Sequence, residues 1–156
     1  MISFSLSRLE KEDIRLEGVE PPEFIVLAES DGFTVAADVS YALDVSKVSG
    51  GALVSGNVST VISGECGRCL AAVSREVATG DFQFFVETPP GMETCDISDE
   101  VRTEITLALP MNLLCKDDCR GLCPGCGADL NREKCSCKPE SARGSGVWDA
   151  LDDLKL

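Results

Sequence analysis

Apolar residues occupy every second position from Phe33 to Val45, and polar residues lie between most of them. This two-residue period is typical of a β-strand with one buried face and one face in water. The same period returns over 52–64 and, around Gly80, over 72–87, and the Gly50 and Gly51 pair marks a turn. Successive strands with short links predict an antiparallel meander.

The first 32 residues carry a weaker signal. Residues 4–9 suggest a short strand, residues 16–22 an irregular crossing segment with two prolines, and residues 24–27 another strand. The bland interpretation of the apolar residues in the β region is that they form the core.

From Ser98 onward the apolar period lengthens. Val101, Ile105, Ala108 and Leu109 recur at helical spacing. This predicts one amphipathic helix over 98–109, capped by Ser98 or Asp99 and ended by Pro110. The predicted fold class is α+β, an antiparallel meander or barrel-like sheet with one main helix and a cysteine-rich, zinc-ribbon-like module.

Nine cysteines are present, and six of them fall within residues 115–137. The run contains a CxxC knuckle in CPGCG and a later CxC. An earlier CxxC, Cys66 and Cys69, lies at the predicted turn between the second and third strands, where Gly67 is expected to supply a positive φ. Cys95 stands alone in a predicted acidic loop and is expected to be a spare thiol.

These segments predict three regions. Residues 1–114 form the β domain with its knuckle and helix, and residues 115–138 form the cysteine-rich zinc-binding module. Residues 139–156 are a linker and a short C-terminal helix, whose apolar side chains either dock on the body or bind a partner. The apolar side chains of that helix are Val147, Trp148, Leu151 and Leu154.

The expected cellular compartment decides how the clustered cysteines are interpreted. The N-terminus lacks the features of a secretory signal, and no apolar run approaches the roughly 20 residues of a membrane span. A reducing cytoplasm is therefore expected, where clustered cysteines indicate metal ligands or redox groups rather than disulfides. Histidine is absent, which excludes mixed cysteine and histidine zinc sites and imidazole chemistry.

Eight cysteines suffice for two tetrahedral zinc sites with four thiolates each. The predicted first site joins Cys66 and Cys69 to Cys115 and Cys119, and the second contains Cys123, Cys126, Cys135 and Cys137. One alternative is a single site built from residues 119–137, which leaves the early CxxC free. The same ligands could also hold an iron–sulfur cluster. Structural, closed sites are the default, because a catalytic zinc keeps an open position.

Charge is unevenly distributed along the chain, whose formal net charge is −13. Residues 115–143 contain six basic and five acidic side chains, so the remainder carries −14. The cysteine-rich region is therefore the least repulsive surface for RNA, and the rest favours basic proteins. Candidate contact residues are Arg68, Arg120, Arg132 and Lys134. An equally weighted role for these cations, together with Lys116, is to neutralise thiolate charge.

A group of motifs resembles the YceD family, the large ribosomal RNA subunit accumulation proteins of bacteria and plastids. The motifs are a CxRC knuckle after a strand, a helix ending in LALP, the run LCKDDCRGLCPGCGADLN with a later CSC, and a closing WDALDDLKL. The resemblance covers residues 62–156. It implies a role in 23S ribosomal RNA accumulation and large-subunit assembly, without an established catalytic activity. Some relatives lack the second cysteine cluster, which favours a first site and an optional second one.

Three functions follow as hypotheses. The first is a non-enzymatic assembly factor with structural zinc, which contacts pre-ribosomal large-subunit RNA or basic ribosomal proteins and uses no membrane or small-molecule substrate. The second is a thiol redox enzyme that uses Cys66 and Cys69. The third is a zinc-containing adaptor for a basic protein unrelated to ribosomes.

Overall fold

A computed structural model describes residues 1–28 and 32–137 of the chain. The larger of its two antiparallel sheets contains β2 (Ile14–Glu20), β3 (Phe33–Val35), β4 (Val39–Val48), β5 (Gly51–Glu65), β6 (Ala72–Ala78) and β7 (Phe82–Glu87). The smaller sheet pairs β1 (Ser3–Ser5) with β8 (Thr94–Asp96). The helical segments are α1 (Leu6–Leu9), the 3-10 helix η1 (Pro22–Phe24) and α2 (Ser98–Ala108).

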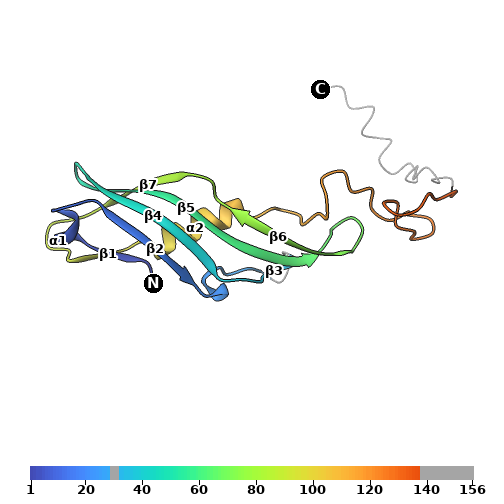
Figure 1. The fold of residues 1–156 in the computed structure, drawn as a ribbon, viewed down its shortest axis with the longest axis horizontal. Helices are drawn as coiled ribbons and strands as arrows, with labels where there is room; N and C mark the ends of the chain where they lie inside the picture. Colours follow the sequence, from blue (N-terminus) through green and yellow to red (C-terminus); the bar gives the residue numbers. More distant parts are fainter. Residues whose placement is uncertain (29–31, 138–156) are drawn as a thin grey trace, which may run out of the picture.

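The larger sheet is the predicted meander, with β5 at its centre (Figure 1). One edge of β5 pairs with β3 and β4, and the other edge pairs with β6 and β7. The predicted α+β class, an antiparallel sheet with one main helix, is therefore confirmed. Among the described residues, no helix has the length and apolar character needed to cross a lipid bilayer.

The strand predicted over 33–45 is interrupted, which corrects the prediction of one continuous strand. Val35 pairs with Ile62 and Ser40 pairs with Ser59, so residues 36–39 lie opposite only residues 60 and 61. The Thr60 hydroxyl donates to the carbonyl of Ala37 at 3.0 Å and lies 3.4 Å from that of Asp38. Thr60 is 4% exposed, and its hydroxyl supplies a partner for the bulged backbone.

The predicted region 72–87 is interrupted in the same way. Ser59 pairs with Ala78 and Gly56 pairs with Phe82, so residues 79–81 lie opposite residues 57 and 58. Gly80, with a φ of +66°, occupies this second bulge. A bulge thus interrupts the neighbours of β5 on each of its edges, between β3 and β4 on one edge and between β6 and β7 on the other.

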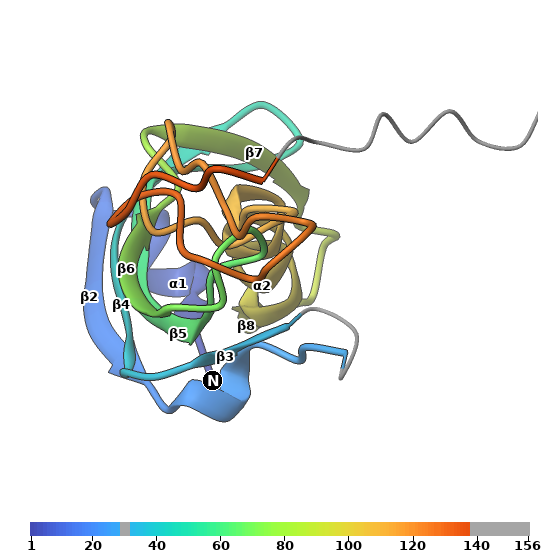
Figure 2. The same ribbon diagram turned by 90° about the vertical axis from the view of Figure 1, so that its right-hand side faces the viewer.

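The sheet curls around α2, which fills its concave side (Figure 2). Val101 and Ile105 on α2 are fully buried, as are Val54, Val58 and Ile62 on the facing side of β5. The alternation in β5 and the helical spacing of α2 therefore each place one apolar face in a common core.

The predicted ends of the helix are partly right. Pro110 ends α2 as expected, because the residue before a proline is driven to an extended conformation and Leu109 has a ψ of 138°. The N-cap position is Ile97 rather than Ser98 or Asp99. The Asp96 carboxylate supplies the capping oxygen instead, accepting from the Ser98 N–H at 2.9 Å.

Several N-terminal predictions were wrong. The first strand is Ser3–Ser5, so only residues 4 and 5 of the expected strand over 4–9 are extended, because the chain turns into α1 at Leu6. The segment expected to be irregular is β2, which pairs with β4 along its length. The strand expected over 24–27 is not present. Phe24 ends η1 instead, with the Arg102 guanidinium 4.8 Å above its ring.

Cys95 also differs from its predicted loop position. It lies in β8 opposite Phe4 and is 4% exposed. The Pro89 and Pro90 pair therefore ends the larger sheet, but one more short strand follows it.

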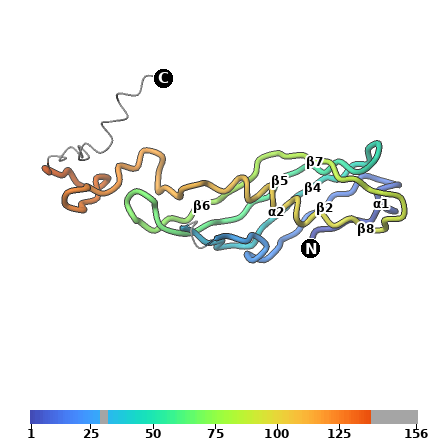
Figure 3. Tube along the Cα trace, turned by 180° about the vertical axis from the view of Figure 1, so that it is seen from behind, coloured from blue at the N-terminus to red at the C-terminus, as the bar shows by residue number. Residues whose placement is uncertain are grey.

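The molecule is elongated, with α1 near one end and the cysteine-rich segment beyond the other (Figure 3). Residues 111–137 run past the β5–β6 turn, away from the sheet core (Figure 1). The predicted C-terminal helix lies outside the described residues.

Candidate metal centres

The first cysteine group joins two parts of the chain. Cys66 and Cys69 lie on the β5–β6 turn, whereas Cys115 and Cys119 follow α2. The Sγ atoms of Cys66 and Cys119 are 3.8 Å apart, and those of Cys69 and Cys115 are 3.6 Å apart. All four Sγ atoms lie within 4.8 Å of one another. Cys115 is exposed and the other three are buried, so the group lies at the edge of the protein.

Backbone hydrogen bonds shape this knuckle. The Leu70 N–H donates to the Cys66 carbonyl at 2.9 Å, and the Gly67 N–H donates to the Leu113 carbonyl at 2.8 Å. The positive φ of the turn falls on Leu70, at 59°, and not on Gly67 as predicted. The left-handed residue is needed at the end of the turn, where the chain rejoins β6. Gly67 lies near the start of the turn instead.

Arg68 ties the two halves of the first group together. Its Nη1 donates to the carbonyl of Cys119 at 2.9 Å and lies 3.3 Å from the carbonyl of Asp117. This predicted RNA-contact residue therefore also has a structural role in the knuckle, and its replacement would affect both.

The second cysteine group is local. Cys123, Cys126, Cys135 and Cys137 also have Sγ atoms within 4.8 Å of one another. The Cys135 Sγ lies 3.3 Å from those of Cys123 and Cys126. The Gly125 N–H donates to the Cys123 Sγ at 3.4 Å, and the Cys137 N–H donates to the Cys135 Sγ at 3.2 Å. Each pair of cysteines thus forms a turn whose amides point toward sulfur.

The structure brings the eight predicted ligands together in the predicted division. The single site proposed over 119–137 is not what forms, because Cys119 lies with the first group. Cys95 belongs to neither group.

The second group is attached to the first by a short segment. The Leu122 N–H donates to the Arg68 carbonyl at 3.2 Å. The Asn131 Nδ2 donates to the Cys119 Sγ at 3.4 Å, and the Asn131 Oδ1 accepts from the Arg120 N–H at 2.9 Å. Asn131 was not predicted from the sequence. Its position two residues after Asp129 signals a local turn but does not indicate which sulfur it would reach.

Each group contains one thiol with a strongly lowered pKa. The backbone N–H of Cys69, followed by that of Cys115, lowers the pKa of Cys66 to about 6. The backbone N–H groups of Cys126 and Gly125 lower the pKa of Cys123 to about 6. Hydrogen bonding to the neighbouring Cys119 sulfur raises the pKa of Cys115 to about 12. Several thiolates in one group repel one another, so full ionisation requires a cation among them.

The donor sets fit a soft, four-coordinate metal. Four thiolates suit zinc or an iron–sulfur centre, and hard cations such as magnesium prefer oxygen ligands. The amides that point at sulfur are the outer contacts that orient such ligands.

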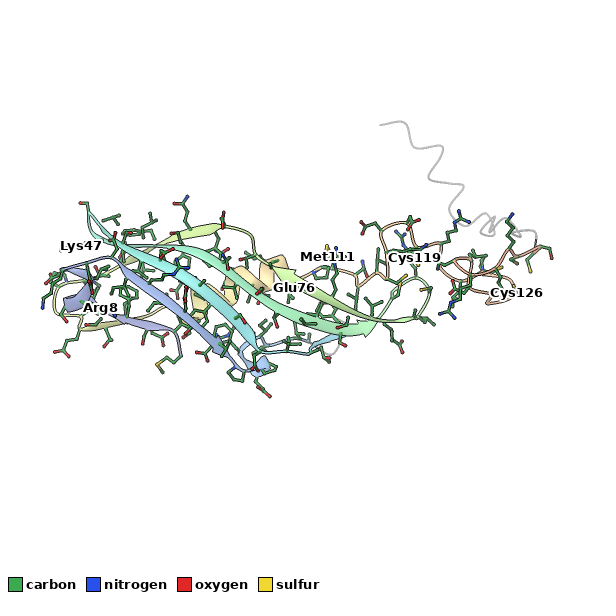
Figure 4. All side chains as sticks on the ribbon, in the orientation of Figure 1. Arg8, Lys47, Glu76, Met111, Cys119 and Cys126 are labelled. Atoms are coloured by element: carbon green, nitrogen blue, oxygen red, sulfur yellow. The ribbon has the colours of Figure 1, made fainter. Side chains whose placement is uncertain are left out.

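Of the remaining candidate contact residues, Arg120 follows Cys119 of the first group, and Arg132 and Lys134 lie on the loop of the second group. Arg132 pairs with Asp129, with Nε to Oδ2 at 3.4 Å. Arg120 and Lys134 are exposed, and their side chains form no ion pair within the described residues. Figure 4 shows Cys119 and Cys126 at the opposite end of the molecule from Arg8 and Lys47.

Comparison with known proteins finds a family that resembles the C-terminal part of the chain. Residues 85–155 match the model of the family described as large ribosomal RNA subunit accumulation protein YceD. This region contains α2 and both cysteine runs after it, but not Cys66 and Cys69. No solved structure matches the chain.

Individual relatives match over limited lengths. An uncharacterized protein of Mycobacterium tuberculosis is 34% identical over 117 residues, which cover 64% of this chain and 56% of the relative. The chloroplastic large ribosomal RNA subunit accumulation protein YCED homolog 1 of Arabidopsis thaliana is 34% identical over 67 residues, covering 42% of this chain and 21% of the relative. Its Zea mays counterpart is 39% identical over 57 residues, which cover 36% of this chain and 20% of the relative. The chain thus spans about half the length of the mycobacterial relatives and about a fifth of the plant ones. The chain is thus similar to the YceD family over residues 85–155 and to two plant proteins that carry that family's name over shorter stretches.

Proposed function

We propose that this protein is a non-enzymatic ribosome biogenesis factor that supports 23S ribosomal RNA accumulation and large-subunit assembly in the cytoplasm. We also propose that its two cysteine groups hold one structural zinc ion each. The observation that carries the zinc proposal is the convergence of eight Sγ atoms into two sets of four, within 4.8 Å in each set. The ribosomal role rests on the family match over residues 85–155 and on the names of the plant relatives.

Zinc held by four thiolates would neutralise half of their formal charge and cross-link the segments that carry them. Cys66, Cys69, Cys115 and Cys119 would join the tip of the sheet to the segment after α2. Cys123, Cys126, Cys135 and Cys137 would close the terminal loop. A complete thiolate set leaves no open position for substrate, which supports a structural rather than a catalytic role.

The proposed partner is pre-ribosomal large-subunit RNA or a basic ribosomal protein. The cysteine-rich end offers the exposed cations Arg120, Arg132 and Lys134, whereas the sequence outside residues 115–143 is strongly acidic. This distribution favours contact with phosphates at one end and repels RNA along the body. The acidic body would in turn attract basic proteins.

The experiment is co-sedimentation with large-subunit precursors. Arg120→Ala combined with Lys134→Ala removes two cations that have no ion pair within the described residues, so the knuckle should be preserved. Arg8→Ala combined with Lys47→Ala removes the same charge at the opposite end of the molecule and serves as the matched control.

We expect the first variant to sediment less with precursors and to lose part of the salt dependence of binding, by a slope of about 0.7–0.9 per lost phosphate contact. The control should behave as wild type, and metal content should be unchanged in both. Equal association of the two variants would refute contact through the cysteine-rich end.

A thiol redox function is the second candidate. It requires an accessible attacking thiolate, and the low pKa of Cys66 is compatible with that chemistry. Cys66 and Cys69 are buried, at 0% and 8% exposed, and they lie against two further sulfurs. This arrangement favours metal ligation. Rapid alkylation of Cys66 and Cys69 in the native protein, with the other thiols protected, would instead support the redox function.

A further inference from the structure

The Asn131 side chain is held in one orientation by three hydrogen bonds. Its Nδ2 donates to the Asp129 Oδ1 at 2.8 Å and to the Cys119 Sγ at 3.4 Å, and its Oδ1 accepts from the Arg120 N–H at 2.9 Å. Rotating the amide by half a turn would point its oxygen at the carboxylate and the sulfur, and its NH₂ at another donor. The hydrogen-bond partners thus fix which end of the Asn131 amide is the nitrogen and which is the oxygen.

Asn131 lies on the loop of one cysteine group, and the sulfur that accepts its hydrogen bond belongs to the other group. Cys119 is a member of the first group and is 4% exposed. Asn131 lies on the loop between Cys126 and Cys135, whose Sγ atoms are 3.3 Å apart in the second group. The Cys126 and Cys135 sulfurs thus close the loop that carries the amide.

An N–H that donates to a thiolate stabilises its charge and fixes its direction, which strengthens its bond to a metal. Removal of such an outer contact typically costs about 10–100-fold in metal affinity.

We infer that Asn131 couples the two cysteine groups, so that metal binding in the second group strengthens metal binding in the first. This inference rests on the proposed metal binding. Coupling of two sites is reciprocal, so metal in the first group also favours closure of the second. The protein would then load its metals cooperatively and present the cysteine-rich end as one unit.

The test is a competition titration of the full chain with Co²⁺ and then Zn²⁺, following the sulfur-to-cobalt charge-transfer band. The variants are Asn131→Ala, Asn131→Leu, which keeps the volume of the side chain without donors, and Asn112→Ala. Asn112 is an exposed asparagine near Cys115 without a side-chain hydrogen bond among the described residues, so it is the matched control. Cys135→Ser with Cys137→Ser removes the second group, alone and combined with Asn131→Ala.

We expect both Asn131 variants to weaken the first site by about 10–100-fold, to shift its charge-transfer band, and to leave the second site unchanged. The variant without the second group should weaken the first site similarly, and adding Asn131→Ala should then have no further effect. Asn112→Ala should match wild type.

Wild-type affinity at the first site in Asn131→Leu would overturn the coupling. So would an undiminished effect of Asn131→Ala in the chain that lacks the second group. A wild-type chain that binds no metal would instead refute the proposed function, which keeps the two failures distinct.

Discussion

Cys66 and Cys119 are 53 positions apart in the chain, and their Sγ atoms lie 3.8 Å from each other. The contact brings the β5–β6 turn against the segment that follows α2. It places the early CxxC in a four-sulfur group rather than alone at the sheet tip. A metal at this point would therefore fix the direction in which the cysteine-rich segment leaves the body.

Metal removal should affect one end of the molecule more than the other. The apolar core is formed by the sheet, α1, η1 and α2, whereas a separate buried cluster contains Cys66, Cys69 and Cys119. We expect a chelator to increase hydrogen exchange over 111–137 and in the β5–β6 turn, because the metal-free knuckles keep their turns but open locally more often. Amides in β4 and β5 should keep their protection. Loss of protection throughout the sheet would contradict this separation.

The two low thiol pKa values predict a specific titration. Backbone N–H groups within each knuckle lower the pKa of Cys66 and of Cys123 from an ordinary 9.0 to about 6. A lowered pKa stabilises the folded state above the ordinary value, and this contribution is lost as the pH falls through about 6.

We therefore expect the ultraviolet thiolate absorbance of the metal-free, reduced protein to rise near pH 6. Cys66→Ser and Cys123→Ser should each remove part of that step, and Cys95→Ser should not, because burial raises the pKa of Cys95. A single rise near the ordinary thiol pKa would show that the knuckles do not form without metal.

Thr60 should stabilise the sheet through its hydroxyl. Thr60→Val keeps the shape but leaves the Ala37 and Asp38 carbonyls without this donor, which typically costs about 1–3 kcal/mol. Thr60→Ser keeps the hydroxyl and should lower the free energy of unfolding by less. The free energies of unfolding from urea titration give the comparison, and a fully stable Thr60→Val would show that the bulge does not need the bond.

Regular periods were the most predictable part of the fold. Val54, Val58 and Ile62 alternate with polar residues in β5, and Val101 and Ile105 follow helical spacing in α2, so both elements were predicted correctly. The bulges were not predicted, because the alternation around Ala37 continues through the interruption. β2 was not predicted, because its inward face contains Gly18 and its outward Val19 is 63% exposed. Gly18 leaves space for the Tyr41 ring on the neighbouring strand.

The sequence spacing of the cysteines predicted only part of the candidate site. CxxC and CxC pairs fix which sulfurs are neighbours locally. Counting ligands gave two sites, and the division followed because the last four cysteines are close enough in sequence to form one site by themselves. The contacts of Arg68 and Asn131 depend on how the second loop lies against the first knuckle. No periodicity or motif in the chain encodes that relationship.

Elemental mass spectrometry of the native protein decides whether both cysteine groups hold zinc. The wild type should contain two zinc ions per chain, and Cys66→Ser combined with Cys69→Ser should contain one, because the second group is complete without the early knuckle. The Cys95→Ser variant should retain both ions. An unchanged metal content in the Cys66 and Cys69 double variant would contradict the account, because those sulfurs would then not be ligands.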